Sequence, residues 1–416
     1  MPSASGSPTI VRDRGSRSSS SRGVRVLVTG GEFTGALAAV RALAAARYEP
    51  WVAASDLGAY AARSRAAFGV IRVPSSADDP DGFIEKLRSA SEARHFSAMV
   101  AGSERDLLAI ARCRQRLGDL AMGTPERATV LAITSKSTVN RTASEVGLKI
   151  PPTVETDRDG LSNGSSFPGP LVVKPMRSEH ESTGGGLVHL TPHRVNTPAE
   201  MGRLVPTLIG DRWLIQPCIE GKLGAICGIA WQGTVVSAVH QVTERIWPTD
   251  IGISAYARTV PRDQELEAGV ARLVSALGWS GIFQAQFIHT ERGSFLIDLN
   301  PRIYGSLALA IAAGVNLPAI LVALLAGESV HASPYRVGVR YRTEQDIRAL
   351  FHLGRTGELA AASRGLIPKR RTAHAVVSLK DPLPAMSRLA RLISERRGLH
   401  SRLDGRTRSS THAGKP

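Results

Sequence analysis

The sequence lacks the features that mark membrane, disulfide-bonded and zinc proteins. No run of about 18 or more uncharged apolar residues occurs, which argues against a membrane-spanning helix. There are only 3 cysteines, Cys113, Cys218 and Cys227, and their spacing fits neither a metal site nor a CxxC motif. The 11 histidines form no HExxH motif and no i, i+4 pair suited to zinc. These absences favour a reducing compartment, and we expect a cytoplasmic protein.

The composition is that of an ordinary folded protein with basic ends. At 416 residues the chain is long enough for two or three domains, and its 43% hydrophobic and 21% charged residues are typical of globular proteins. Residues 1–22 are basic but contain no apolar segment before a cleavage site. We therefore expect a disordered leader there, and not a secretory signal. We expect a second disordered basic segment, a tail, at residues 401–416.

The net charge of +16 is concentrated in three segments. Residues 1–22 carry +3, residues 364–371 carry +4 and residues 386–416 carry +6, which leaves +3 for the rest of the chain. Basic tails bind polyanions without sequence preference, but more often they only solvate a terminus. Because no RNP, zinc-finger or helix-turn-helix pattern accompanies them, the sequence disfavours nucleic acid as a partner.

Residues 23–125 alternate between apolar strands and helices. "VRVLVTGG" (24–31) is followed by an alanine-rich helix, and further strands are expected at 49–55 and 96–103. Short connections between strand, helix and strand predict a parallel, doubly wound sheet. The glycines of "TGGEFTGALAAV" do not form GxGxxG, because Glu32 interrupts the pattern, so the evidence for a dinucleotide site there is weak.

Residues 126–330 show the pattern of an α+β unit with antiparallel strands. "KLGAICGIAWQGTVVSAVH" predicts two strands around a "WQGT" turn, and "GIFQAQFIHTERGSFLIDLN" predicts a hairpin that turns at "TERG". An amphipathic helix, "DQELEAGVARLVSALGW", separates the two pairs. The fold class predicted for the whole chain is therefore α/β followed by α+β.

Two catalytic motifs are present in part and do not fit their contexts. "GLSNG" (160–164) matches GxSxG, but the surrounding residues predict a loop without the strand and helix that a nucleophile elbow requires. "TSKST" has the Lys-Ser pair of a P-loop but lacks its first glycine. Neither motif supports a function.

Polar side chains cluster at the end of one predicted strand, "FLIDLNPRIYGS" (295–306). Alternation places Asp298 and Asn300 on the same side of this strand, and Gln286 faces them from the partner strand of the hairpin. Oxygen ligands of this kind suit Mg²⁺, which takes few protein ligands and relies on substrate phosphates for the rest. The plainer interpretation is a strand end with a capping Asn.

Other segments share this phosphate chemistry. Lys174 ends a predicted buried strand, where a lysine needs an anion, and the run from Thr183 to Gly186 can fold main-chain amides around phosphate oxygens. Arg302, two residues beyond Asn300, could clamp a transferring phosphoryl group. A single strand-end lysine is more often a surface residue, but the order and spacing of the set favour a nucleotide site.

Four segments carry a resemblance to a known family: "TSKSTVNRTASEVGLKIP", "PLVVKPM" with the later "TGGG", "LIQPCIEG", and the stretch beginning "GIFQAQFIHTERGSFLIDLNPRIYGS". Together they resemble the ATP-grasp superfamily. The greatest likeness is to stand-alone carboxylate–amine ligases related to the synthetase domains of the carbamoyl-phosphate synthase large subunit. The resemblance covers about residues 24–327 and is most specific at 283–318.

The resemblance implies a domain order. It implies a pre-ATP-grasp domain at 23–125, an ATP-grasp unit at 126–330 that divides into a lid subdomain (about 150–220) and a catalytic subdomain (about 221–330), and ATP held between the two subdomains. Residues 331–400 are expected to form an extension that closes over the catalytic subdomain.

The resemblance also assigns roles to residues. It implies nucleotide lysines at Lys136 and Lys174, a phosphate loop at Thr183, Gly184, Gly185 and Gly186, an adenine hinge at Gln216, Pro217 and Ile219, magnesium ligands at Gln286, Asp298 and Asn300, and a γ-phosphate arginine at Arg302. Of these, Arg302, Lys174 and Asp298 are the expected catalytic residues. Pro217 replaces a common Glu, and Asp298 stands where Glu is commoner. Glu220 is the nearest candidate for the acid that holds the ribose.

The expected substrate loop spans residues 240–258. Arg245 and Arg258 are plausible partners for a carboxylate, and the alternative that both are solvated strand residues carries equal weight. The remaining substrate candidates follow the same comparison with the family: Ser254, Tyr304, Gly305 and Ser306.

The function that the resemblance implies is an ATP-dependent ligase of the acid–amino-acid type, which joins a small-molecule carboxylate to an amine in small-molecule or peptide metabolism. A carboxylate attacks the γ-phosphate, with two Mg²⁺ ions and the lysines balancing the charge, and an amine then attacks the acyl phosphate to give an amide, ADP and phosphate. No protein nucleophile is needed. The alternatives are an ATP-grasp kinase or carboxylase that forms an acyl or carbamoyl phosphate, and a non-catalytic nucleotide-binding protein. The sequence predicts no membrane partner and leaves a homodimer open.

Overall fold

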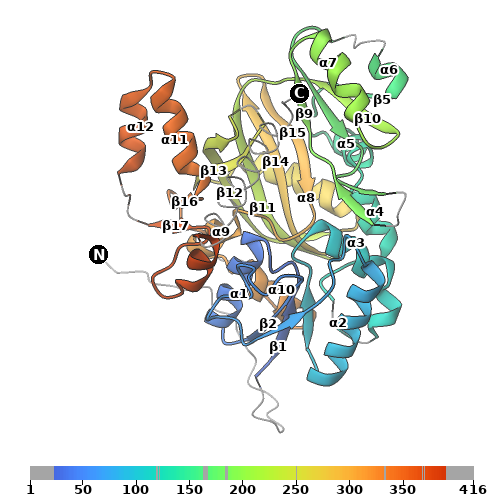
Figure 1. Ribbon diagram of the computed structural model, residues 1–416, viewed down its shortest axis with the longest axis vertical. Helices are drawn as coiled ribbons and strands as arrows, with labels where there is room; N and C mark the ends of the chain where they lie inside the picture. Colours follow the sequence, from blue (N-terminus) through green and yellow to red (C-terminus); the bar gives the residue numbers. More distant parts are fainter. Residues whose placement is uncertain are drawn as a thin grey trace, which may run out of the picture.

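The computed structural model describes residues 23–389, except residues 119, 121, 163–166, 183–185, 250, 332, 333, 368 and 370. The leader (1–22), the tail (401–416) and three residues of the expected phosphate loop, Thr183, Gly184 and Gly185, lie outside the described residues. Figure 1 shows an α/β unit at the N-terminus, a large central sheet, a smaller unit at the upper right and a helical hairpin at the left.

The N-terminal unit is a four-stranded parallel sheet with strand order β3-β2-β1-β4. Apolar residues on the two sides of β1 enter different cores: Val26 and Val28 pack with helix α1, and Leu27 packs with α2 and α3. Helices on both faces make this the doubly wound sheet that the sequence predicts. Its elements are β1 (Arg25–Val28), α1 (Thr34–Ala45), β2 (Glu49–Ala54), β3 (Gly69–Arg72), α2 (Pro80–Arg94), β4 (Ala98–Val100) and α3 (Glu104–Arg112).

The glycine-rich turn after β1 serves packing between the N-terminal unit and the central sheet. A Cβ on Gly35 would lie 2.6 Å from the carbonyl oxygen of Tyr304 and 2.6 Å from a methyl group of Ile303. Only glycine allows α1 to approach residues 303–304 so closely. The third glycine of "TGGEFTG" is therefore explained by packing.

The smaller unit contains an antiparallel sheet with order β5-β10-β6-β9 and a separate ribbon of β7 and β8. Its core includes Leu161, Val173, Trp213 and Ile215. Short helices α4 (Arg127–Ile133) and α5 (Lys136–Glu145), preceded by η1 (Arg114–Leu117), connect it to the N-terminal unit. Its elements are β5 (Val154–Asp157), α6 (Arg158–Ser162), β6 (Leu171–Pro175), β7 (Glu179–Glu181), β8 (Leu187–His189), β9 (His193–Val195), α7 (Pro198–Leu204), η2 (Val205–Thr207) and β10 (Arg212–Pro217).

The context predicted for the "GLSNG" motif was wrong in one respect. Strand β5 ends at Asp157, with two residues between it and the motif, and residues 160–162 are the last three of helix α6. Ser162 is the last residue of this helix, and its hydroxyl donates a hydrogen bond to the carbonyl of Arg158 at 3.1 Å. A serine bonded to its own helix is not placed as a nucleophile at a strand–helix turn.

The central sheet has seven strands in the order β15-β14-β11-β12-β13-β16-β17, antiparallel except for the last pair. Both predicted hairpins are present, and Gln232 and Gly233 in the first turn have φ values of 50° and 76°, as type I′ turns require. The elements are β11 (Lys222–Trp231), β12 (Thr234–Trp247), β13 (Ile253–Thr259), α8 (Gln264–Ala276), β14 (Gly281–Thr290), β15 (Gly293–Asn300), α9 (Leu307–Ala312) and α10 (Leu317–Leu325).

Both faces of the central sheet are covered. Phe283, Ala285 and Phe287 share a core with helices α5 and α8, whereas Ala225, Cys227 and Val239 share one with α1, α9 and α10. Helices α9 and α10, whose residues are mostly apolar, are thus part of the core. None of the described helices combines the length and apolarity that a membrane crossing requires.

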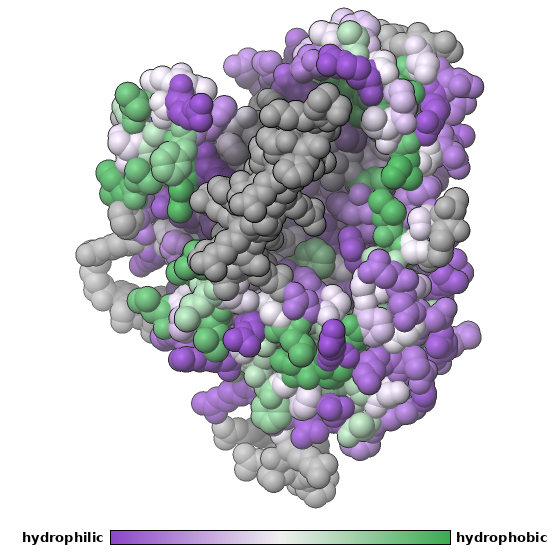
Figure 2. Space-filling model, viewed as in Figure 1, coloured by the Kyte–Doolittle hydropathy of each residue, from purple (hydrophilic) through white to green (hydrophobic). Residues whose placement is uncertain are grey.

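The residues after α10 add strands to the sheet and then return to the N-terminal unit. β16 (Arg340–Arg342) pairs with β13, and the helical hairpin of α11 (Gln345–Arg355) and α12 (Leu359–Leu366) precedes β17 (Thr372–His374). The hairpin exposes apolar side chains, including Phe351 and Leu359, which are 71% and 69% exposed (Figure 2). Asp381, further along, binds the N-terminal unit through Arg41.

Candidate active site

Three oxygen-bearing side chains meet on the β14–β15 hairpin. Gln286 on β14 lies opposite Asp298 on β15 in the strand register. The side-chain amide of Asn300 donates hydrogen bonds to Gln286 Oε1 at 3.4 Å and to Asp298 Oδ2 at 3.2 Å. All three side chains therefore point to the same face of the hairpin, as strand alternation requires.

A β-bulge next to Asp298 joins this hairpin to the smaller unit. Gln286 pairs with Asp298 but Phe287 pairs with Leu296, so Ile297 is the extra residue of β15. The carbonyl of Ile297 accepts a hydrogen bond from Lys174 Nζ at 3.0 Å. Since Lys174 lies on β6, the bulge provides the acceptor that joins this buried lysine of the smaller sheet to the central sheet.

Lys136 makes a second link between the residues after β6 and the β14–β15 hairpin. It is the first residue of α5, whose N-terminus is capped by the side chain of Ser135. The main-chain N–H of Lys136 donates to Met176 O at 3.0 Å. Its ammonium group donates to Asp298 Oδ1 at 3.1 Å and to Ser178 Oγ at 3.2 Å. Lys136 thus contacts both the residues just after β6 and the oxygen-bearing side chains on β15.

The electrostatics of the cluster follow from burial and close opposite charges. Burial raises the pKa of Asp298, but Lys136, Lys174 and then Arg302 outweigh it, so the pKa of this carboxyl lies below its usual range. Burial opposes the charge of Lys136, yet Asp298 and Glu104 raise its pKa above the ordinary value. For Lys174, burial dominates and lowers the pKa to about 8.

Arg302 completes the cluster on the hairpin side. One guanidinium nitrogen donates to Asn300 Oδ1 at 3.0 Å, and another donates to the carbonyl of its neighbour Ile303 at 3.1 Å. Arg302 acts electrostatically on Asp298 and on Glu104. The guanidinium therefore lies among the acidic groups of the site, with its position fixed by the strand end.

Glu104 is a site residue that the sequence does not reveal. It begins α3 of the N-terminal unit, is only 8% exposed, and makes no hydrogen bond or ion pair with any other described residue. Burial raises its pKa, while Arg302 and Lys136 lower it in part. An acidic residue in the first turn of a helix is ordinarily explained by its favourable interaction with the helix dipole. No sequence signal therefore points to this position as part of the site.

The described end of the expected phosphate loop lies against the N-terminal unit. Gly186 accepts a hydrogen bond from Ser182 N at 2.8 Å, and the next N–H, of Leu187, donates to Ala77 O at 2.7 Å. A Cβ on Gly186 would lie 2.8 Å from the same carbonyl oxygen. This glycine is therefore required by the contact with residue 77, whatever the loop binds.

The residues of the expected adenine hinge connect β10 to β11. The Gln216 side chain is buried and donates to Thr153 Oγ1 at 2.9 Å. Pro217 pairs with Leu171, and Cys218 N donates to Pro170 O at 2.8 Å. Ile219 is half-buried and Glu220 is exposed. The side-chain hydrogen bond of Gln216 thus fixes the end of β10 to the residue that precedes β5.

Several expected substrate residues are engaged elsewhere. Arg245 forms a bidentate ion pair with the fully buried Asp346 at 2.5 and 3.0 Å, and Arg258 pairs with Glu244 at 2.9 Å. Ser254 accepts a hydrogen bond from Thr243 Oγ1 at 3.0 Å. Both guanidinium groups therefore have acidic partners, buried for Arg245 and more exposed for Arg258, and a role for either arginine in binding a substrate carboxylate stays a prediction.

The other substrate candidates follow Arg302 directly. Tyr304 is buried in the core beneath α1, and the exposed Gly305 accepts a hydrogen bond from Tyr341 at 2.8 Å. Ser306 is buried and accepts from Gln241 Nε2 at 3.0 Å and from Gln284 Nε2 at 3.5 Å. Tyr304 and Ser306 therefore support the floor of the site. In sum, the structure brings together six of the predicted residues: Lys136, Lys174, Gln286, Asp298, Asn300 and Arg302.

Comparisons with known proteins point to one fold. Residues 210–347 match the family described as "ATP-grasp in the biosynthetic pathway with Ter operon". No curated protein sequence matches the chain. Among solved structures, an L-amino acid ligase from Bacillus licheniformis is similar with a TM-score of 0.54 and 17% identity, over 74% of this chain and 75% of that one.

Two further structures contain nucleotides. N5-carboxyaminoimidazole synthetase from Staphylococcus aureus in complex with ADP has a TM-score of 0.58 and 13% identity, over 75% of this chain and 80% of that one. The biotin carboxylase domain of Hydrogenobacter thermophilus 2-oxoglutarate carboxylase, with MgADP, ADP and bicarbonate, has a TM-score of 0.57 and 15% identity, over 76% of this chain and 73% of that one. The match over residues 210–347 and the similarity to these structures show that the chain has the ATP-grasp fold.

Proposed function

We propose that this protein is an ATP-dependent ligase that joins a carboxylate to an amine through an acyl phosphate and releases ADP and phosphate. The observation that carries the proposal is the convergence of Lys136, Lys174 and Arg302 on Asp298, at the junction of the smaller unit and the central sheet. Three cations around two acids, Asp298 and Glu104, leave an excess of positive charge, which suits a polyphosphate.

The side chains present fit magnesium that arrives with ATP. Gln286, Asp298 and Asn300 offer hard oxygen ligands on one face, and the described residues contain no group of three or more His, Cys, Asp or Glu that could hold a metal alone. A site with one carboxylate among its ligands binds Mg²⁺ mainly through the phosphates of the nucleotide. When bound, Mg·ATP supplies the phosphoryl group and neutralises charge as it is transferred.

The residues of this chain would contribute position and electrostatics. Lys174 and Lys136, each held by the hairpin, would bind phosphate oxygens from two sides, and Arg302 would stabilise the charge on the transferring group. The proposed attack comes from a substrate carboxylate, so the reaction requires no nucleophile from the protein.

The remaining assignments belong to the same proposal. Main-chain groups from Pro217 to Ile219 would hold adenine, Glu220 would approach the ribose, and the loop from Thr183 to Gly186 would cover the phosphates. The partners would be small-molecule acids and amines in the cytoplasm. The lid and catalytic subdomains would correspond to about 150–220 and 221–330.

A screen for ADP release over pairs of acids and amines, with mass analysis of the product, tests the proposal. We expect ADP only when both an acid and an amine are present, and Asp298→Asn should lower kcat by about 10²-fold or more because charge stabilisation is lost. Asp159→Asn, an exposed change in α6, is a matched control. ADP with an isolated acyl or carbamoyl phosphate would indicate the kinase or carboxylase alternative, and no ADP from any pair would contradict the proposal.

A further inference from the structure

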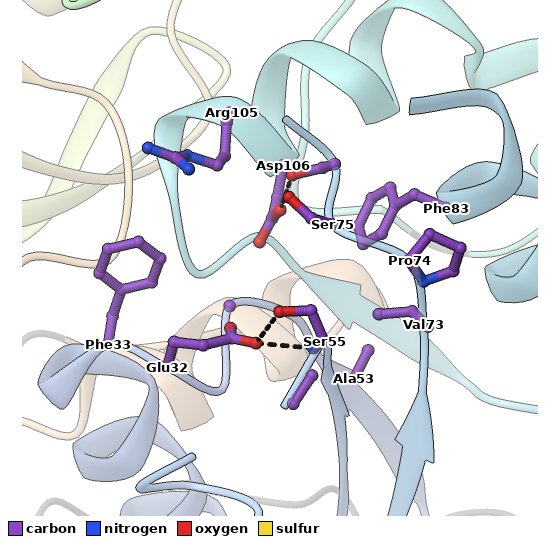
Figure 3. Close-up of a pocket in the computed structure, with 13 residues that line it drawn as sticks. Glu32, Phe33, Ala53, Ser55, Val73, Pro74, Ser75, Phe83, Arg105 and Asp106 are labelled. Carbon is purple, nitrogen blue, oxygen red and sulfur yellow. Dashed lines mark hydrogen bonds between the residues drawn. The ribbon is translucent and has the colours of Figure 1, made fainter. Parts of the chain in front are cut away.

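A pocket of about 120 Å³ lies in the N-terminal unit beside the candidate active site (Figure 3). It is formed where the parallel strands β1, β2 and β3 end and where α3 begins, which is the edge at which open α/β sheets bind ligands. A cavity of about 150 Å³ holds a benzene molecule, so this pocket has room for one small molecule or for part of a larger one. None of the predicted site residues lines it.

Glu32 provides negative charge on one side of the pocket. Its Oε1 accepts hydrogen bonds from the main-chain N–H of Ser55 at 2.6 Å, from Ser55 Oγ at 2.7 Å and from Asp56 N at 3.3 Å. All three bonds end on one oxygen. The other oxygen, Oε2, makes no hydrogen bond with the described residues, so a carboxylate fixed in place has one oxygen left for a ligand (Figure 3).

Arg105 provides positive charge on the opposite side. Its NH2 contacts Glu179 of β7 at 3.4 Å, and its side chain is 29% exposed. Its Nε is buried and has no hydrogen-bond partner among the described residues. A buried donor without an acceptor is costly, and this guanidinium has unused donors in a fixed position.

The third charged residue of the pocket, Asp106, is already satisfied. Its Oδ1 accepts from Ser76 Oγ at 2.5 Å and its Oδ2 accepts from Thr29 Oγ1 at 2.8 Å. Burial is the largest influence and raises the pKa of this carboxyl, while the hydroxyl donors oppose it. Asp106 therefore holds the pocket wall together, and Glu32 and Arg105 are the two charges presented to a ligand.

The pocket adjoins the parts of the molecule proposed to hold phosphates. Arg105 directly follows Glu104, which acts electrostatically on Lys136 and Arg302. Its partner Glu179 lies on the ribbon after Lys174. The wall residue Ser76 precedes Ala77, whose carbonyl accepts from Leu187 at the end of the expected phosphate loop. A ligand here would lie next to the transferring group.

We propose that this pocket binds an amino acid as one of the two substrates, with its ammonium group on Glu32 and its carboxylate on Arg105. The proposal rests on the proposed ligase function and narrows its substrate class. A molecule with both charges contacts both side chains, whereas a simple acid or a simple amine leaves either the second oxygen of Glu32 or the unused donors of Arg105 without a ligand partner. Selectivity for a zwitterion over either analogue follows from that difference.

Binding measurements on the full chain test the pocket directly. The probes are the twenty common amino acids, screened by saturation-transfer NMR and then titrated by calorimetry, with and without Mg²⁺ and a non-hydrolysable ATP analogue. For each binder, the analogues that lack the amino group or the carboxylate should bind at least about 10-fold more weakly, as expected for a lost hydrogen bond to a charged group.

Charge-removing variants locate the site. Glu32→Gln keeps an oxygen for Ser55 but loses the charge, and Arg105→Gln loses the guanidinium, so each should weaken binding about 10-fold or more. Glu85→Gln and Arg88→Gln, an exposed pair on α2, are matched controls and should leave affinity unchanged. Nucleotide affinity and melting temperature report whether each variant is folded.

The outcomes separate this inference from the function on which it rests. No amino acid bound under either condition, equal binding of the analogues, or full binding by both pocket variants would overturn the pocket assignment. ADP release with pairs that contain no amino acid, unaffected by Glu32→Gln, would keep the ligase and overturn the pocket. Amino-acid binding lost in both variants, without ADP release from any pair, would keep the pocket and contradict the ligase.

Discussion

Lys174 holds its proton less firmly than an ordinary lysine. It is buried, its ammonium group donates to the main-chain carbonyl of Ile297, and its pKa is lowered to about 8. Nucleotide phosphates next to Lys174 would favour the protonated form. Below pH 8 the lysine is already charged, so binding takes up no proton there; above pH 8 it must gain one.

ATP affinity should therefore be nearly constant from pH 7 to 8 and fall at higher pH, with a limiting slope of about tenfold per pH unit for one proton. Calorimetry at pH 8.5 to 9 in buffers of different ionisation enthalpy should show proton uptake. Lys174→Met should abolish the uptake and weaken binding. Lys86→Met, an exposed change on α2, should keep the wild-type profile. A flat affinity from pH 7 to 9.5 would contradict this role.

Some residues of the candidate site can be predicted from the sequence, and others are found only in the structure. Strand alternation places Asp298 and Asn300 together from the sequence alone. It cannot foresee the bulge at Ile297, because no residue type there marks an extra position, and the bulge supplies the acceptor for Lys174. Glu104 and Glu32 belong to the N-terminal unit, and only tertiary packing places Glu104 near Lys136 and Arg302 and Glu32 in the pocket.

Helix α1 shows how one element positions the site. Its residue Gly35 lies against the side chain of Ile303 and the main chain of Tyr304, directly after Arg302, so the helix supports the segment that carries the arginine. Adding a Cβ there meets a carbonyl oxygen at 2.6 Å, and backbone does not yield as a flexible side chain would.

Gly35→Ala should therefore destabilise the protein by about 1–3 kcal/mol, as overpacking does. Gly202→Ala in α7 is the matched control, since nothing lies within 4 Å of its added Cβ. There the change should stabilise the helix by up to about 1 kcal/mol, because alanine is the better helix former. Urea unfolding followed by far-UV circular dichroism measures both. Equal effects of the two substitutions would refute the close contact.

Both hairpins and the α9–α10 pair could be predicted at the level of elements, since turn residues and apolar spacing mark them locally. Strands β3, β16 and β17 could not, because they contain 4, 3 and 3 residues and are defined by their neighbours in the sheet. The Arg245 contact illustrates the consequence: Asp346, its partner, is 101 residues away and belongs to α11 of the extension.

At the scale of the whole molecule, the segment around Asp381, which follows the last strand of the central sheet, contacts the N-terminal unit. Asp381 is 6% exposed and accepts hydrogen bonds from Arg41 Nε at 2.8 Å, Ser64 Oγ at 2.6 Å and Arg65 N at 2.9 Å. Burial raises the pKa of this carboxyl, but these donors together hold it below its usual value. The contact ties a segment that follows the central sheet to the N-terminal unit.

Asp381→Ala should lower the free energy of unfolding by about 3 kcal/mol, because it leaves buried donors without an acceptor. Since the pKa of Asp381 is lowered in the folded state, the stabilisation is complete at neutral pH and is lost as the pH falls through that value. The difference between wild type and variant in melting temperature should shrink on acidification. Lys380→Ala, its exposed neighbour, should match wild type. A constant difference down to pH 3 would refute the ionic contact.

The central claim is transfer of the γ-phosphoryl group to a carboxylate at the Lys136–Lys174–Asp298–Arg302 cluster. The most direct measurement uses an acid labelled with ¹⁸O in its carboxylate, together with ATP, Mg²⁺ and an amine. Attack on the γ-phosphorus breaks its bond to ADP, and attack of the amine on the acyl carbon then expels phosphate with one carboxylate oxygen. The account predicts one ¹⁸O in the released phosphate for each amide formed, with the yield greatly reduced in Asp298→Asn. Amide formation with unlabelled phosphate would contradict it.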